Sequence, residues 1–239
     1  MAHISRKELK KDEVRETLVH GAEAVYTHQK LVAYVLGIAL IVAIAVFGWR
    51  FYSQRQTMKA SAALDDALKV YNARLRVAGE PEEPGELSYI VEKNKYEDAF
   101  KKLIEVAQRY PRTRPGQLAG YYAALSLEKL GRDAESQKWL QELASSGDDD
   151  FAALARFELA QIADRTGKPD EAVKLYQQLI AKPAVLVPKP VAMLALANHW
   201  RKTNPAEAAK LYNQIKSEFP DTGIAQQADQ ELELLPSKT

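Results

Sequence analysis

The sequence predicts an all-α chain in which one N-terminal membrane-spanning helix precedes a solenoid of about four helix hairpins and a C-terminal capping helix. Two observations carry this prediction. Residues 31–49, LVAYVLGIALIVAIAVFGW, contain no charged side chain, and four later segments repeat one pattern every 36 or 37 residues. The chain has no cysteine, which excludes disulfides, thiolate metal sites and thiol nucleophiles.

The apolar run 31–49 has the length of a membrane span. A helix of this length rises about 28 Å, which matches the hydrocarbon core of a bilayer. Lys30 and Arg50 mark its two edges, and Trp49 stands where an aromatic belt forms. A buried core helix is usually shorter. A cleaved signal peptide is the stronger alternative, because residues 43–45 are Ala-Ile-Ala, but thirty residues precede the run, and we expect an uncleaved anchor at 31–51.

The charges that flank the span leave its orientation open. Residues 1–30 hold six Lys and Arg, and residues 50–76 also hold six, so the positive-inside rule gives a tie. A short cytoplasmic tail with the large domain outside is the commoner layout. The absence of cysteine suits an oxidising compartment on that outer side.

Two segments near the N-terminus each allow two interpretations. Residues 1–30 carry a narrow apolar stripe on a charged background, typical of an amphipathic helix on a membrane or partner, or of a solvated lead-in helix. Within the span, Ala33 and Gly37 are small residues four apart. Such a pair lets another membrane helix approach closely, or it reflects the alanine-rich composition of a simple anchor.

After the span the helical period continues. Apolar residues recur at helical spacing from Gln54 to Val77 with no proline, so we expect the membrane helix to run on into the next domain. Residues 79–85, GEPEEPG, then break the helix. The predicted layout is a tail at 1–30, the span at 31–51, the long helix and acidic loop at 52–94, repeats with a cap at 95–235, and a tail at 236–239.

Four segments repeat between residues 95 and 220. The small residues Ala99, Ser136, Ala172 and Ala208 are spaced by 37, 36 and 36. Each segment follows a second helical stretch and a short turn, which makes the unit a helix hairpin. The segments are KYEDAFKKLIEVAQRYP at 95–111, RDAESQKWLQELAS at 132–145, KPDEAVKLYQQLIAKP at 168–183 and NPAEAAKLYNQIKSEFP at 204–220.

The best-formed hairpin resembles the tetratricopeptide repeat family. Residues 157–163, FELAQIA, followed by Gly167, the pair Glu171-Ala172 and then Tyr176, carry the family's pattern of small and large residues. Small side chains stand where two helices touch, and large ones fill the gap to the next hairpin. The resemblance covers residues 57–235 and implies stacked helix hairpins.

The resemblance also implies a concave groove, lined by the first helix of each hairpin, that binds another protein. Apolar anchors would be Tyr121, Phe157 and Trp200, although each aromatic is equally explained by packing between helices. Lys129, Arg165 and Arg201 would meet carboxylates of an extended peptide. The positions that correspond to the groove are Tyr121, Leu125, Glu128, Lys129, Phe157, Gln161, Asp164, Arg165, Met193, Ala197, Trp200 and Arg201.

The overall layout is similar to that of a bacterial inner-membrane family described as ancillary subunits of the Sec translocon. The likeness rests on the short tail, the single span with its Gly48-Trp49-Arg50 exit, and the long helix that follows. It implies repeats in the periplasm and contacts with translocon subunits, periplasmic chaperones or exported polypeptides, besides membrane lipid. The alternative is a homo-oligomeric scaffold or assembly factor for another envelope complex.

The sequence predicts no enzyme, no cofactor and no metal site. It has no Gly-rich phosphate loop and no G-x-S-x-G motif, and no two histidines have metal-ligand spacing. The 33 Lys and Arg against 32 Asp and Glu give no case for nucleic acid. The histidines are His3, His20, His28 and His199.

One acidic cluster, residues 148–150, has two interpretations. Three consecutive carboxylates can bind a cation, but Gly147 before them and Phe151 after them indicate a helix start. Carboxylates at such a position cap free N–H groups and face the positive end of the helix dipole, and we favour this structural role.

Overall fold

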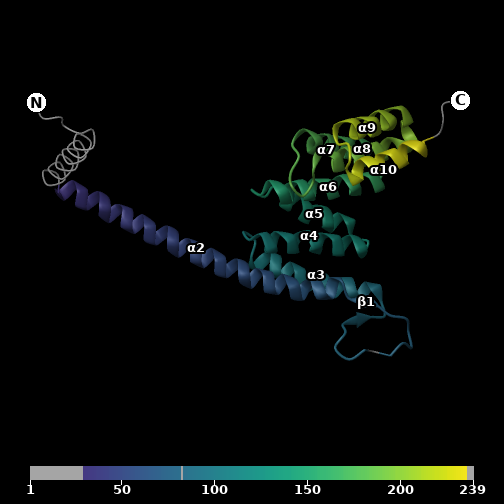
Figure 1. Cartoon of the computed structure of the whole chain (residues 1–239). Coiled ribbons are helices and arrows are strands. Elements are labelled where there is room, and N and C mark those ends of the chain that lie inside the picture. The colour runs from purple at the N-terminus through teal and green to yellow at the C-terminus, as the bar shows by residue number, and fades with distance from the viewer. Residues whose placement is uncertain (1–28, 82, 236–239) are drawn as a thin grey trace, which may run out of the picture. The chain divides into compact units, whose positions relative to one another are not determined.

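A computed structural model of the chain describes residues 29–81 and 83–235. The predicted amphipathic stripe up to residue 28, with His3, His20 and His28, and the tail 236–239 lie outside the described residues. The described helices are α2 Gln29–Tyr71, α3 Glu92–Arg109, α4 Arg114–Lys129, α5 Asp133–Ala144, α6 Asp149–Arg165, α7 Pro169–Ala181, α8 Lys189–Thr203, α9 Pro205–Glu218 and α10 Gly223–Glu233 (Figure 1). The predicted all-α class, with four hairpins and a C-terminal cap, is confirmed.

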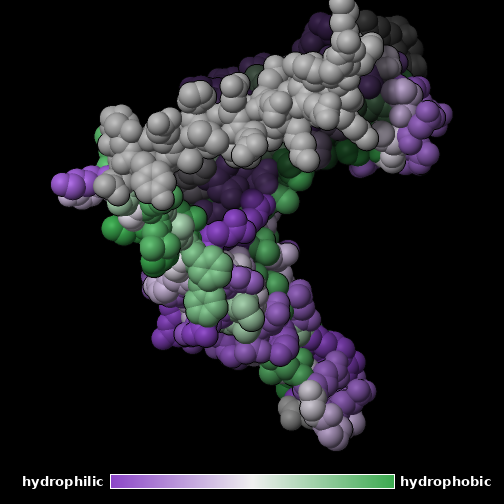
Figure 2. Space-filling model, turned by 60° about the vertical axis from the view of Figure 1, so that its left-hand side comes forward, coloured by the Kyte–Doolittle hydropathy of each residue, from purple (hydrophilic) through white to green (hydrophobic). Residues whose placement is uncertain are grey.

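The chain divides into two compact units, residues 1–55 and residues 56–239. The described part of the first unit is the beginning of α2. Within the described residues, α2 from Ala33 onward is the helix long and apolar enough to cross a membrane, with a mean hydropathy of 2.1 in an 18-residue window of which none is buried. Its large side chains are exposed, and Trp49 keeps 69% of its surface. Hydrophobic surface of this kind is drawn in green in Figure 2. Such a helix is a membrane span or a signal anchor.

The second unit stacks its helices in chain order (Figure 1). Residues 56–71 of α2 pair with α3, and the later hairpins are α4/α5, α6/α7 and α8/α9, with α10 packed on α9. Buried alanines stand where the helices cross, because a methyl group lets two helix axes approach closely. Ala160 and Ala172 are fully buried, as expected, and Tyr176 and Leu179 fill the space toward the next hairpin.

Glycines close two of the hairpins. Gly131 and Gly167 have φ values of 70° and 76°, a left-handed conformation that a Cβ disfavours. Each lies directly after a helix, where this conformation turns the chain back for the second helix of the hairpin. The turns predicted at residues 129–131 and 165–167 are therefore present.

The long loop after α2 differs from the prediction. The helix ends at Tyr71 and not at Val77, and β1 Arg74–Leu75 pairs in parallel with β2 Ser88–Tyr89. The Arg76 side chain holds this arrangement: its Nε donates to Ser88 Oγ at 2.9 Å and its Nη1 donates to the Glu80 carbonyl at 2.5 Å. These contacts outweigh the local helical pattern, since residues 72–77 gain partners across the loop.

The acidic cluster 148–150 caps a helix. Asp148 Oδ1 accepts hydrogen bonds from the backbone N–H groups of Asp150 and Phe151 at the start of α6. Arg114 bridges Asp148 and Asp150, each at 3.0 Å, and Asp149 pairs with Lys182 at 2.7 Å. All three carboxylates thus have partners within the protein.

Candidate functional site

A groove of about 880 Å³ runs between α6 and α8. We call it the α6–α8 groove. All four predicted positions of α6 line it: Phe157, Gln161, Asp164 and Arg165. They share one face of α6 because they are spaced at three or four residues, and α7 closes the back of the groove through Tyr176.

A second hollow of about 440 Å³ lies between α4 and α6. Leu125, Glu128 and Lys129 of α4, three of the four predicted positions on that helix, line it, and Tyr71 of α2 borders it. Arg165 belongs to both hollows. The first helices of three hairpins therefore share one line of hollows that meets at this side chain.

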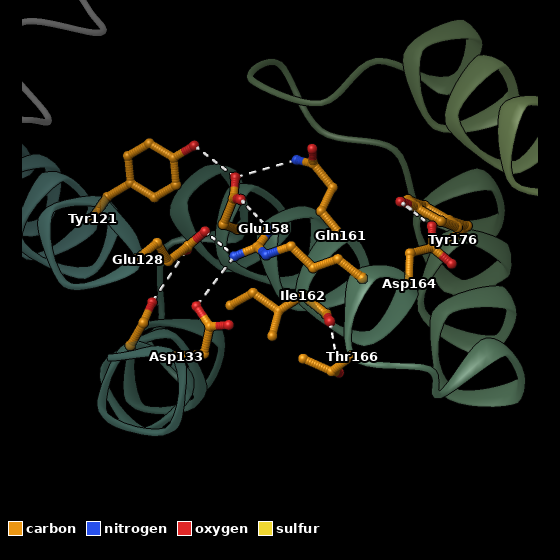
Figure 3. Close-up of polar contacts among 11 residues, drawn as sticks. Tyr121, Glu128, Asp133, Glu158, Gln161, Ile162, Asp164, Thr166 and Tyr176 are labelled. Atoms are coloured by element: carbon orange, nitrogen blue, oxygen red, sulfur yellow. Dashed lines mark hydrogen bonds and ion pairs between the residues drawn. The ribbon is translucent and has the colours of Figure 1, made fainter. Parts of the chain in front are cut away.

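Arg165 faces three carboxylates, which we call the carboxylate cluster: Glu128, Asp133 and Glu158 (Figure 3). Its Nη2 donates to Glu128 and lies 3.6 Å from Asp133, and its Nη1 lies 3.9 Å from Glu158. Figure 3 shows that Glu128 and Glu158, from α4 and α6, point toward one another. One guanidinium thus serves three negative groups from three helices.

Burial changes the protonation of the cluster. Loss of solvent raises the pKa of Glu158 to about 7, and the neighbouring charge of Glu128 adds to this effect. Burial also raises the pKa of Glu128, although Arg165 opposes the shift. A carboxyl group of this kind keeps its proton at a pH where an exposed glutamate has lost it.

Neighbouring donors hold Glu158 in place. Its Oε2 accepts hydrogen bonds from the Tyr121 hydroxyl at 3.3 Å and from the Gln161 amide at 3.2 Å. Tyr121, the fourth predicted position on α4, therefore supports the cluster and packs edge-on against Tyr122, whose ring meets Tyr71. The prediction did not include Tyr71 or Tyr122, although both stand at helical spacing in the sequence.

Asp164 joins three helices at the floor of the α6–α8 groove. It accepts a hydrogen bond from the Tyr176 hydroxyl of α7 at 3.1 Å and lies 2.5 Å from Nδ1 of His199 on α8. Burial, with the charge of Asp164, raises the pKa of the Tyr176 hydroxyl. These polar contacts fix the spacing of α6, α7 and α8.

On α8 the structure corrects the predicted positions. Met193 and Ala197 are 1% and 0% exposed and belong to the core shared with α9 and α10, so neither reaches the groove. Trp200, predicted as an apolar anchor, is half-buried and packs against the cores on both sides of α8. Among the predicted α8 positions only Arg201 lines the groove, and it is paired with Glu231 of α10 at 2.5 Å.

The residues that line the groove from α8 stand one position further along. A period of 37 residues, applied to Phe157, Gln161, Asp164 and Arg165, leads to Leu194, Asn198, Arg201 and Lys202, and all four line the groove. The prediction used 36 residues. One residue turns a helix by about 100°, which is enough to exchange the groove face for the core face.

In the first unit, Ala33 and Gly37 are exposed on α2. Among the described residues, no atom lies within 4 Å of a Cβ placed on Gly37. The described residues also include no group of three or more His, Cys, Asp or Glu side chains that could hold a metal ion.

Comparison with known families matches residues 27–184 to the tetratricopeptide repeat-like domain. The chain belongs to this family. The match includes most of α2 and the hairpins through α7. The tetratricopeptide repeat itself matches residues 157–222, which are α6 to α9. The search of curated proteins and the search of solved structures returned no match. Repeat domains of this family are protein-interaction modules.

Proposed function

We propose that the chain is a membrane-anchored interaction module that binds an extended polypeptide along the first helices α4, α6 and α8. The observation that carries this proposal is the pair of hollows that meet at Arg165. Together they line up the same face of successive hairpins, where a segment of several residues can lie against one continuous surface.

The chemistry of the lining suits a peptide. Phe157 and Val191 offer apolar contact, while the side-chain amides of Gln161 and Asn198 can pair with the N–H and C=O groups of a main chain. Main-chain contacts give affinity without demanding one sequence. An interaction module for many clients needs this combination.

The finer assignment is an ancillary subunit of the bacterial Sec translocon. What supports it is the layout of tail, span and repeats, together with the long apolar α2 helix and the repeat family. In this proposal α2 is a single inner-membrane span with the N-terminus in the cytoplasm. The repeats then stand in the periplasm, where they meet exported polypeptides or their chaperones, and the Ala33–Gly37 face packs against a helix of the channel.

A pull-down in mild detergent tests this function. The intact chain and a chain that begins at residue 57 are purified in parallel, and co-purified proteins are identified by mass spectrometry. We expect translocon subunits and exported polypeptides with the intact chain, and the polypeptides without the channel in the truncated sample. Recovery of only the chain itself, or of one unrelated envelope complex, would instead favour the scaffold function.

A further inference from the structure

The α6–α8 groove has an excess of positive charge. Its lining holds the cationic side chains of Arg165, Arg201 and Lys202 against the one carboxylate of Asp164. The hollow between α4 and α6 is balanced by comparison, with Lys129 and Arg165 against two glutamates. The two halves of the binding face therefore differ in charge.

The partners of these cations inside the chain decide which one can meet a ligand. Arg165 is shared by the carboxylate cluster, and Arg201 is held by Glu231. Lys202 is exposed, and neither a hydrogen bond nor an ion pair joins its side chain to another residue in the described part of the chain. Asp164 is already paired with Tyr176 and His199 and leaves the charge of Lys202 uncompensated.

An apolar wall lies on the same helix as Lys202. Val191, Leu194 and Ala195 of α8 face the groove opposite Phe157 of α6. From Leu194 to Lys202 the helix rises about 12 Å, and an extended peptide covers this distance in roughly four residues. Asn198 stands halfway between them, where its amide can pair with the peptide backbone.

We propose that the α6–α8 groove selects acidic, apolar segments: an aromatic or aliphatic side chain lies against the wall, and a carboxylate about four residues away pairs with Lys202. This selectivity rests on the proposed function, since it names the class of peptide that the groove takes. Lys202 is then a specificity-determining residue, because its ammonium favours a carboxylate and repels a basic side chain at the same place.

Three synthetic peptides test the selectivity. Each has blocked ends, a fluorescent label and the same Phe- and Leu-containing centre, and they differ only at the positions four residues to either side, which are Asp, Asn or Lys. Binding to the full-length chain in a non-ionic detergent is followed by fluorescence anisotropy. We expect the Asp peptide to bind about tenfold more tightly than the Lys peptide at low salt, and this preference to shrink in high salt.

Matched variants assign the preference to the residue. Lys202→Glu is expected to reverse the order of the Asp and Lys peptides, and Lys202→Gln to abolish it. Lys174→Glu is the control, since Lys174 is an exposed lysine of α7 that does not line the groove, and it should leave the order unchanged. Equal binding of the Asp and Lys peptides, or a preference that survives Lys202→Glu, overturns the proposal.

Val191→Asp separates this proposal from the function on which it rests. If all three peptides bind equally and Val191→Asp weakens them all, the groove binds polypeptide and only the acidic preference is wrong. If no peptide binds the intact chain, both the preference and the proposed function are wrong.

Discussion

At the scale of single residues, the charges of the binding face converge on Arg165. The side chain lies between the two hollows and pairs with carboxylates from α4, α5 and α6. Three carboxylates around one guanidinium leave negative charge uncompensated. This explains why burial is able to raise the pKa of both glutamates in the cluster.

The raised pKa of Glu158 makes the stability of the chain depend on pH. The folded-state pKa of about 7 lies above the ordinary value of 4.5, so this group stabilises the fold below pH 4.5 and loses that contribution as pH rises through 7. We expect Glu158→Gln to remove this dependence and to raise the free energy of unfolding at pH 8 by roughly 1–3 kcal/mol relative to the unsubstituted chain.

Thermal unfolding at pH 5 and pH 8, followed by circular dichroism, checks this prediction. Glu171→Gln serves as the control, because Glu171 is exposed on α7 and makes a 3.7 Å pair with Lys168. The groups that face Glu158 are Tyr121, Gln161, Arg165 and Glu128. A Glu158→Gln variant as pH-sensitive as the unsubstituted chain would contradict the raised pKa.

The sequence was informative for single residues where the period of the repeat was correct. On α6 it led to four residues that the structure places in the groove, because Gly167 fixes the end of that helix and therefore its register. On α8 it led to Met193 and Ala197, which are buried. Their helix follows the link 182–188, where Val187 is buried in the core and sets the start of α8 in a way that a fixed period does not include.

At the scale of elements, the turn between α3 and α4 is the tightest place in the first two hairpins. A Cβ on Gly116 would lie 1.9 Å from the backbone oxygen of Tyr110, a contact that no side-chain movement relieves. We expect Gly116→Ala to lower the free energy of unfolding by about 2–4 kcal/mol, because the turn must move. Chemical denaturation followed by circular dichroism measures the change.

Gly120 provides the comparison on the same helix. A Cβ there would meet only the Ala107 Cβ, at 3.6 Å, an ordinary contact. Gly120→Ala should therefore stabilise the chain by up to about 1 kcal/mol, since alanine favours helix over glycine. If both alanine variants unfold alike, the close approach at Gly116 does not exist.

The span is the second element whose residues make a prediction. Since no described atom surrounds Gly37, Gly37→Leu should leave the unfolding temperature of the repeat unit unchanged. We expect it to reduce the recovery of channel subunits severalfold, because a larger side chain separates two closely packed membrane helices. Val46→Leu, nine residues on and half a turn away, is the matched control. Unchanged recovery with Gly37→Leu would reduce α2 to a simple anchor.

At the scale of the whole molecule, the repeats form a compact unit that begins at Gln56. We expect a chain that starts there to unfold in one cooperative transition in the absence of detergent, because its cores connect α2 to α10 without a break. Circular dichroism and size-exclusion chromatography measure this. An aggregated or non-cooperative product would show that the repeats need the rest of the chain.

The sequence was sufficient for the whole-molecule plan because two strong signals do not depend on tertiary detail. An uncharged run of nineteen residues and a 36-residue period define a span and stacked hairpins in any context. The loop after α2 was missed for the opposite reason. Its strand pair is held by side chains such as Arg76 and Ser88, twelve residues apart, and no local pattern contains that contact.

Site-specific photocrosslinking tests most directly whether the face of α4, α6 and α8 binds extended polypeptide. A photoreactive residue replaces Gln161 in the groove or Lys174 on α7, and the full-length chain is incubated with a permanently unfolded, carboxymethylated polypeptide or with its folded form. The account predicts a strong adduct from position 161 with the unfolded form alone, and little from position 174. Equal adducts from both positions, or none from position 161, would contradict it.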